Sequence, residues 1–291
     1  MSAAPRPSAA PLTLVTGATG TTGSRVADGL IRRGVPVRAA ARRVPEHPGG
    51  VRFDWYEPGT HDAALAGVRG LYLVPPVGAA DPAAVMLPFL RRAREAGAVR
   101  AVLLSSSQIG ADDPGTGAVH AALPGLFPEW AVLRPSWFMQ NFTGDHQHAR
   151  SVRADGVLTT ATGAGRVAFI DADDIAAVAV HALTAVRPLD DAPVLTGPQA
   201  LSYADVAAVI GAVTGRPVRH EAVSAARMRE RFAAEVPEEF AAVLAALDAR
   251  IADGAEDRVT PAVQRITGRP PRAFAEFAAA HAAAFTPGAR P

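Results

Sequence analysis

Residues 12–43 read LTLVTGATGTTGSRVADGLIRRGVPVRAAARR and decide the fold. The apolar run 12–16 favours β-structure and stops at a glycine, which is typical of a buried strand. Apolar residues at helical spacing follow over 24–33, Gly34 ends that expected helix, and a second expected strand covers 35–41. A strand, a glycine-rich turn, a helix and a strand within about 30 residues form a βαβ unit.

The glycines of the turn are spaced for binding a dinucleotide. Gly17 allows a tight turn, Gly20 lets the backbone approach a pyrophosphate, and Gly23 lets the helix pack closely on the sheet. The start of the helix adds free N–H groups and a positive dipole end. We therefore predict that the cofactor's phosphates are bound by Gly17, Thr19, Gly20, Thr21, Thr22 and Gly23.

Arginines at the end of the second strand indicate which dinucleotide binds. The chain has Arg38, Arg42 and Arg43 there, with no acidic residue before Glu46. A carboxylate would repel a 2′-phosphate, whereas a guanidinium binds it in a bidentate manner, so NADPH/NADP is favoured over NAD. The alternative is that one or two of these arginines are only solvated, first of all Arg38, which lies inside the strand. Asp54 matches an adenine-contacting acid or, equally well, a turn cap.

The rest of the chain extends the βαβ pattern and then departs from it. Further expected strands alternate with helices as far as 130–133, which predicts a doubly wound parallel sheet of Rossmann type with helices on both faces. After about residue 140 the pattern becomes mostly helical. We predict a disordered tail over 1–10, an NADP(H)-binding core over 11–150, and a C-terminal substrate lobe over 151–291 with some strands returning to the core.

Two missing residue types limit the chemistry. The sequence has no cysteine and no lysine, which excludes thiolate catalysis, iron–sulfur clusters, Schiff bases and a lysine general acid. A net charge of +1 gives no sign of a nucleic-acid or membrane-surface partner. We expect a cytoplasmic monomer or homodimer without a metal site. His146 and His148 are interpreted as loop residues, and Asp173 or Asp174 as the cap of a helix that begins at 175.

Several segments together resemble one known family. They include VTGATGTTG at 15–23, FDWYEP at 53–58, LLSSSQIG at 103–110, AVLRPSWFMQNF at 131–142 and FIDADDIAAVAVHAL at 169–183. In this order they resemble atypical short-chain dehydrogenases/reductases of the NmrA-like class, nearest to the ergot-alkaloid (festuclavine dehydrogenase-like) reductase branch. The resemblance implies a Rossmann core, NADPH and a small-molecule substrate of secondary metabolism.

Ligands of such sheets bind beyond the carboxyl ends of the strands. This rule places cofactor-binding Pro75 and Ser105 beside the nicotinamide, with a substrate pocket made by Pro76, Gln108, Trp137, Phe138, Met139, Asn141 and Phe142. Aromatic side chains of this segment could stack on a flat substrate or, as the alternative, pack in the local core.

The tyrosine–lysine pair of typical short-chain dehydrogenases is absent, since there is no lysine and the three tyrosines lie elsewhere. Ser107 could replace it by hydrogen bonding the substrate, or only cap a strand end. His120 could act as a general acid, or be a surface histidine on a helix. A cationic iminium substrate would need no enzymic acid.

The sequence therefore predicts an NADPH-dependent reductase of a small aromatic or polycyclic metabolite, with an iminium, imine, enone or quinone-like acceptor. Two alternatives stay open. The first is a non-catalytic NADP(H)-sensing regulator of the NmrA type, and the second is a redox-neutral enzyme on the same fold.

Overall fold

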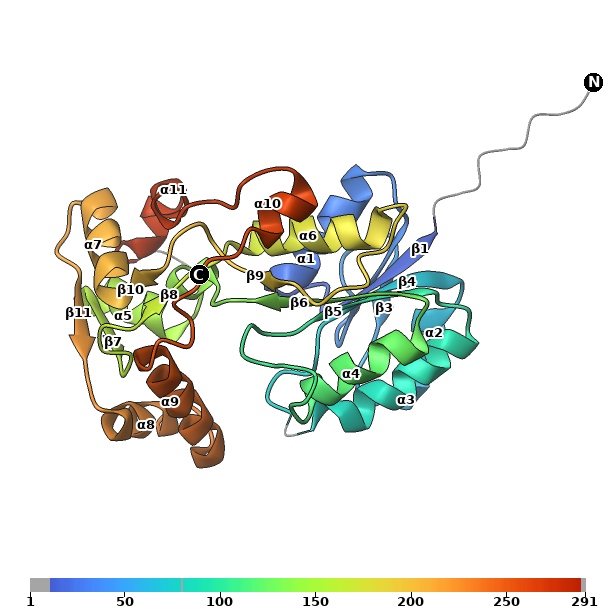
Figure 1. The fold of residues 1–291 in the computed structure, drawn as a ribbon, viewed down its shortest axis with the longest axis horizontal. Helices are drawn as coiled ribbons and strands as arrows, with labels where there is room; N and C mark the ends of the chain where they lie inside the picture. Colours follow the sequence, from blue (N-terminus) through green and yellow to red (C-terminus); the bar gives the residue numbers. More distant parts are fainter. Residues whose placement is uncertain (1–10, 80, 289–291) are drawn as a thin grey trace, which may run out of the picture. The chain divides into compact units, whose positions relative to one another are not determined.

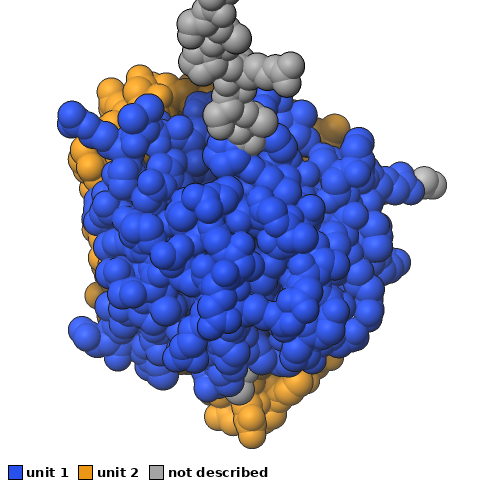
Figure 2. All heavy atoms as spheres, turned by 90° about the vertical axis from the view of Figure 1, so that its right-hand side faces the viewer, with its two compact units in different colours: residues 1–105, 109–133, 176–192 blue, residues 106–108, 134–175, 193–291 orange. Residues whose placement is uncertain are grey.

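The computed structural model describes residues 11–79 and 81–288, so the predicted tail over 1–10 lies outside the described residues. The chain forms two compact units (Figure 2). Unit 1 comprises the residues up to Ser105, Ile109–Leu133 and Ala176–Ala192, and unit 2 comprises Ser106–Gln108, Arg134–Ile175 and the residues from Pro193 onward. Within the described ranges, no helix combines the length and the apolar character that crossing a membrane requires.

A parallel sheet forms the centre of unit 1. Its strands are β1 (Leu12–Thr16), β2 (Val37–Ala41), β3 (Gly50–Arg52), β4 (Val68–Leu73), β5 (Arg100–Leu104) and β6 (Glu129–Pro135). They lie in the order β3-β2-β1-β4-β5-β6 and pair in parallel throughout. The last residues of β6, Arg134 and Pro135, belong to unit 2 and pair with β9 (Val194–Leu195). The predicted doubly wound Rossmann fold is thus confirmed, and its strand order reverses beside β1, where such sheets bind ligands.

Helices cover both faces of the sheet (Figure 1). On one face are α1 (Thr21–Arg32) and α6 (Ala172–Thr184), and on the other are α2 (His61–Leu65), α3 (Pro82–Glu95) and α4 (Thr116–Leu126). The second face holds an apolar core in which the rings of Phe53, Trp55 and Phe89 meet edge to face at centroid distances of 4.9–5.2 Å. This packing fixes the carboxyl ends of the strands, where the site is expected.

Unit 2 is mostly helical. Its remaining elements are α5 (Gln147–Asp155), β7 (Val157–Thr160), β8 (Arg166–Val167), β10 (Leu201–Ser202), α7 (Tyr203–Thr214), β11 (Arg219–Ala222), α8 (Ala225–Ala233), α9 (Glu238–Ala252), α10 (Ala262–Thr267) and α11 (Phe274–Ala280). Strands β7 and β11 pair in parallel, and β8 and β10 antiparallel. A separate core is built around Phe142, Phe169, Tyr203 and Phe274.

Two local expectations for unit 2 were wrong. The histidines interpreted as loop begin α5, because the His146 ring accepts the backbone N–H of His148 and so caps the helix. Helix α6 begins at Ala172 rather than at 175, and the carboxylate of Asp171 accepts the N–H of Asp173 at 3.0 Å. Asp171 therefore takes the capping role expected of Asp173 or Asp174. No group of three or more potential metal ligands occurs among the described residues.

Burial makes His148 an acid-sensitive residue of this core. Its ring is 8% exposed and packs against Tyr203 at a centroid distance of 5.4 Å. Desolvation, with smaller contributions from the charges of His146, His220 and Arg231, lowers the pKa of His148 to about 3. The ring is therefore neutral in the folded chain at any pH above this value.

We expect His148→Phe to reduce the acid sensitivity of the fold. Between pH 6.5 and 3 the unfolded chain binds a proton at His148 that the folded chain does not, so the free energy of unfolding falls by about 1.4 kcal/mol per pH unit as the pH drops. The phenylalanine variant should lose about 2 kcal/mol less than the parent between pH 7 and pH 5. Urea unfolding followed by circular dichroism measures this, and equal losses in both proteins would contradict the assignment.

Candidate functional site

The glycine turn leaves the start of α1 open to an anion. Gly17 has a φ of +62°, its carbonyl accepts the N–H of Gly20 at 2.9 Å, and α1 begins at the next residue. Gly20 offers no side-chain cap, and the first turn of α1 carries no acidic residue. The first amides of a helix have no acceptor within it. The turn therefore has the donors and the dipole that a pyrophosphate needs.

A pocket of about 290 Å³ lies at the end of β2 in unit 1. It is lined by Thr19, Ala41, Arg42, Arg43, Val44, Pro45 and Glu46. The structure thus brings Thr19, Arg42 and Arg43 together, although they were chosen from separate motifs. Both arginines are exposed, and neither makes a hydrogen bond or ion pair with another described residue. Two free guanidinium groups beside a pocket form a suitable site for a phosphate.

The other two residues predicted near the adenosine have partners within unit 1. The Arg38 guanidinium donates to the carbonyls of Ala64 and Ala66 at the end of α2. Asp54 accepts the N–H of Tyr56 at 2.9 Å, which is the geometry of the turn-cap alternative. We therefore do not include Arg38 in the proposed phosphate site.

The carboxyl ends of β1 and β4 are tied together. The hydroxyl of Thr16 donates to the carbonyl of Tyr72 at 3.1 Å and accepts the N–H of Val74 at 2.8 Å. Pro75 and Pro76 follow, both partly exposed. Burial raises the pKa of the Tyr72 hydroxyl well above its usual value, so it is a poor proton donor.

At the end of β5, the hydroxyl of Ser105 is buried and has no hydrogen-bond partner among the described residues. A buried polar atom without a partner is uncommon in folded proteins. The site expected at this strand end can therefore supply a hydrogen bond from Ser105 to a ligand.

Ser107 belongs to unit 2 and is fully engaged there. Its hydroxyl donates to the carboxylate of Glu256, with distances of 2.8 and 3.0 Å to the two oxygens. The hydroxyl of Ser136, just beyond β6, donates to the same carboxylate at 3.2 Å. Ser107 and Glu256 are 3% and 1% exposed. The hydroxyl expected to meet a substrate is therefore already donated within the chain.

Sequence reasoning missed Glu256 and two arginines that accompany it. The guanidinium groups of Arg258 and Arg134 both donate to the carbonyl oxygen of Ser107, at 2.9 and 3.2 Å. Glu256 and Arg258 lie in the irregular segment between α9 and α10, which carries no motif. The segment is held to β9 by the Thr260 hydroxyl, which donates to the carbonyl of Val194 at 2.6 Å.

His120 lies on α4, as the alternative of a helical surface histidine expected, but it is 8% exposed, so its expected place at the surface is wrong. In the aromatic segment, Met139 and Phe142 are fully buried in the core of unit 2, as the packing alternative expected. Trp137, Phe138 and Asn141 are partly exposed and stay candidates for substrate contact.

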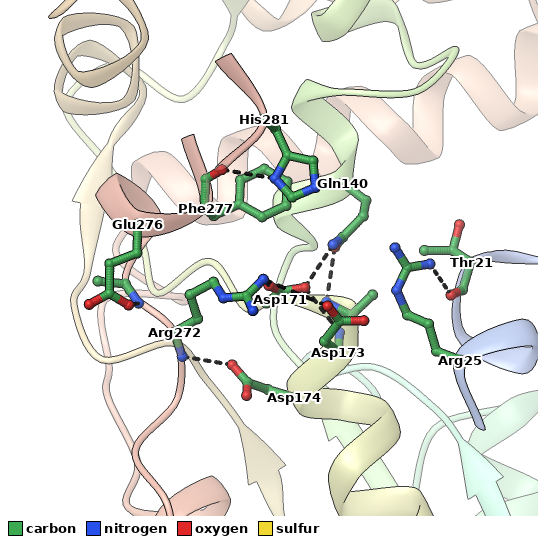
Figure 3. Close-up of polar contacts among 12 residues, drawn as sticks. Thr21, Arg25, Gln140, Asp171, Asp173, Asp174, Arg272, Glu276, Phe277 and His281 are labelled. Carbon is green, nitrogen blue, oxygen red and sulfur yellow. Dashed lines mark hydrogen bonds and ion pairs between the residues drawn. The ribbon is translucent and has the colours of Figure 1, made fainter. Parts of the chain in front are cut away.

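An ionic network in unit 2 orders the end of the aromatic segment (Figure 3). Asp171, the capping residue of α6, accepts the Gln140 amide at 2.8 Å and the Arg272 guanidinium at 2.6 Å. The side-chain carbonyl of Gln140 in turn accepts the N–H of Ala172 at 2.9 Å, and Asp174 accepts the backbone N–H of Arg272 at 2.8 Å. These contacts explain Asp171 and Asp174 as structural residues.

Comparison with known proteins places the chain in a family. No family model matches it. It is 47% identical over 276 residues to the uncharacterized oxidoreductase YesF of Bacillus subtilis, covering 94% of this chain and 96% of that protein. It is 34% identical to festuclavine synthase I of Penicillium roqueforti, covering 91% and 96%.

Among solved structures, a triphenylmethane reductase of Citrobacter sp., determined with NADP(H), superposes with a TM-score of 0.78 at 22% identity. The superposition covers 93% of this chain and 99% of that one, and it supports the fold. The chain belongs to the family of oxidoreductases that includes the festuclavine and agroclavine dehydrogenases.

Proposed function

We propose that the chain is an NADPH-dependent reductase that transfers a hydride to an iminium carbon of a small aromatic or polycyclic metabolite. The observation that carries the choice of NADPH is the pocket beside Thr19, where Arg42 and Arg43 have no partner among the described residues. A 2′-phosphate in this pocket would give both guanidinium groups a charge-assisted hydrogen bond. The pyrophosphate would meet the amides at the start of α1.

An iminium acceptor needs no proton donor, which agrees with the absence from this chain of the tyrosine–lysine pair of typical short-chain dehydrogenases. There is no lysine, and Tyr72 and Tyr203 are buried with raised pKa values. NADPH, when bound, supplies the hydride. The iminium carbon gains the new C–H bond and the C=N π electrons become the nitrogen lone pair, so the cation becomes a neutral amine without a proton. The chain's task is then to bind, to orient and to exclude water.

The names of related proteins support a reductase of small molecules. The relatives reported above include a festuclavine synthase, and the structural neighbour is a triphenylmethane reductase. Triphenylmethane dyes are cationic and aromatic, which agrees with the acceptor proposed here. For this chain, Ser105 would hydrogen bond the bound ligand, and Trp137 or Phe138 would pack on a flat substrate.

The absorbance of NADPH tests this function directly. Purified protein is mixed with NADPH and, separately, with a cyclic iminium salt, an enone and a quinone. We expect consumption of NADPH with the iminium salt at a rate that exceeds the rates with the two neutral acceptors. Tight NADPH binding without consumption by any acceptor would contradict the proposal and favour the sensor alternative.

A further inference from the structure

Ser107 is held at each of its polar groups. Its N–H donates to the carbonyl of Pro135 at 2.9 Å, its carbonyl accepts Arg134 and Arg258, and its hydroxyl donates to Glu256. Glu256 also binds Ser136, and thereby joins the segments that follow β5 and β6. The N–H, the carbonyl and the hydroxyl proton of Ser107 are thus all used within the chain, and these contacts fix the position of the residue.

The next residue, Gln108, is in the opposite situation. Its side-chain nitrogen and oxygen are both buried, and neither has a hydrogen-bond partner among the described residues. A buried amide that has lost its water without gaining a partner costs about 1–3 kcal/mol, so folded chains seldom keep one unless a ligand or water completes it. The amide offers a donor and an acceptor side by side.

We propose that Gln108 binds the substrate by a pair of hydrogen bonds, with Glu256 as the residue that positions it through Ser107. The amide N–H would donate to an acceptor on the substrate and the amide carbonyl would accept from a donor beside it. The ligand class is therefore a small molecule that carries a carboxamide or lactam. The inference rests on the proposed function only in taking the occupant to be the substrate.

Two fragments of similar shape test whether the Gln108 amide forms this pair of hydrogen bonds. Benzamide presents a carbonyl beside an N–H donor, whereas acetophenone presents the carbonyl beside a methyl group. Competition-based NMR on the full chain is expected to show benzamide binding about tenfold more tightly, the value of one buried hydrogen bond. Gln108→Leu should abolish the preference, whereas Gln108→Glu, which loses the donor but keeps an acceptor for the benzamide N–H, should weaken both fragments and keep the preference.

The role of Glu256 is tested by the same comparison, the ratio of the affinity for benzamide to the affinity for acetophenone. Glu256→Gln should lower the preference for benzamide over acetophenone several-fold. The melting temperature of the Glu256→Gln variant should be close to that of the Gln108→Leu variant. Glu239→Gln, at an exposed position on α9, is the matched control and should keep the full preference. A purely structural role for Glu256 would weaken both fragments equally, and that result would overturn the positioning role.

Equal binding of the two fragments by the parent would mean that water completes the Gln108 amide, and it would overturn the proposal. A preference that survives in Gln108→Leu would overturn it as well. Because fragment binding requires no turnover, these outcomes are distinct from a failure of the reductase function, which would appear as unconsumed NADPH.

Discussion

Replacing Arg42 and Arg43 together by alanine is expected to weaken NADPH binding by about 100-fold or more, and NADH binding by less than about threefold. Each guanidinium would donate to the 2′-phosphate, and hydrogen bonds to charged groups contribute about 1.5–3 kcal/mol each. Since about 1.4 kcal/mol is tenfold in affinity, two such bonds give the stated factor. NADH has a hydroxyl at this position, so it gains nothing from the arginines.

Calorimetric titration of both nucleotides measures this selectivity. Arg91→Ala is the control, because Arg91 is exposed on α3 and has no hydrogen-bond or ion-pair partner among the described residues. It should leave both affinities near those of the parent. Equal weakening of NADPH and NADH in the double variant would refute the phosphate assignment.

Gly23→Ala is expected to lower the affinity for NADPH by at least about tenfold, by the loss of one charge-assisted hydrogen bond. A Cβ at Gly23 would lie 2.1 Å from the carbonyl oxygen of Gly17 and 2.7 Å from its carbon. Both are backbone atoms, so the turn or the start of α1 must move. The amides at the start of α1 would then no longer point at the pyrophosphate. The change tests whether these amides hold the nucleotide.

Gly125→Ala supplies the matched control for that substitution. Gly125 lies in α4, and a Cβ there would meet nothing within 4 Å. Its NADPH affinity should equal that of the parent, and its melting temperature should be equal or slightly higher, because alanine favours a helix more than glycine does. Gly23→Ala should remain folded but bind poorly, as titration and thermal unfolding together would show; undiminished affinity in this variant would exclude the turn as the phosphate site.

The first βαβ unit could be predicted closely because its signals are local. Strand β1 falls on the predicted residues, and α1 starts only three residues earlier than the expected helix. The bounds of α4 were not predicted, although one interpretation of His120 placed it on a helix, since Gly117, Pro124 and Gly125 interrupt the pattern. The stability of α4 comes from packing, with Val119 and Leu123 in the core of unit 1, and packing between distant segments leaves no local signal.

The residues of the candidate site likewise fall into those that local sequence motifs predict and those that only the structure reveals. Thr19, Arg42 and Arg43 follow from two motifs separated by one helix, and the pocket unites them. Glu256 could not be found from sequence, because it is 149 residues from Ser107 and nothing in its segment distinguishes it from Asp253 or Asp257. Ser107 was chosen for its place after β5, and only the structure reveals that its hydroxyl is engaged.

A crystal structure of the protein with NADP⁺ would locate both the pyrophosphate and the 2′-phosphate of the nucleotide. We expect the pyrophosphate over the amides of Gly20, Thr21 and Thr22, and the adenosine 2′-phosphate in the pocket within hydrogen-bond distance of Arg42 and Arg43. A nucleotide phosphate lying elsewhere, or crystals that stay free of nucleotide at saturating NADP⁺ with the turn accessible, would contradict this expectation.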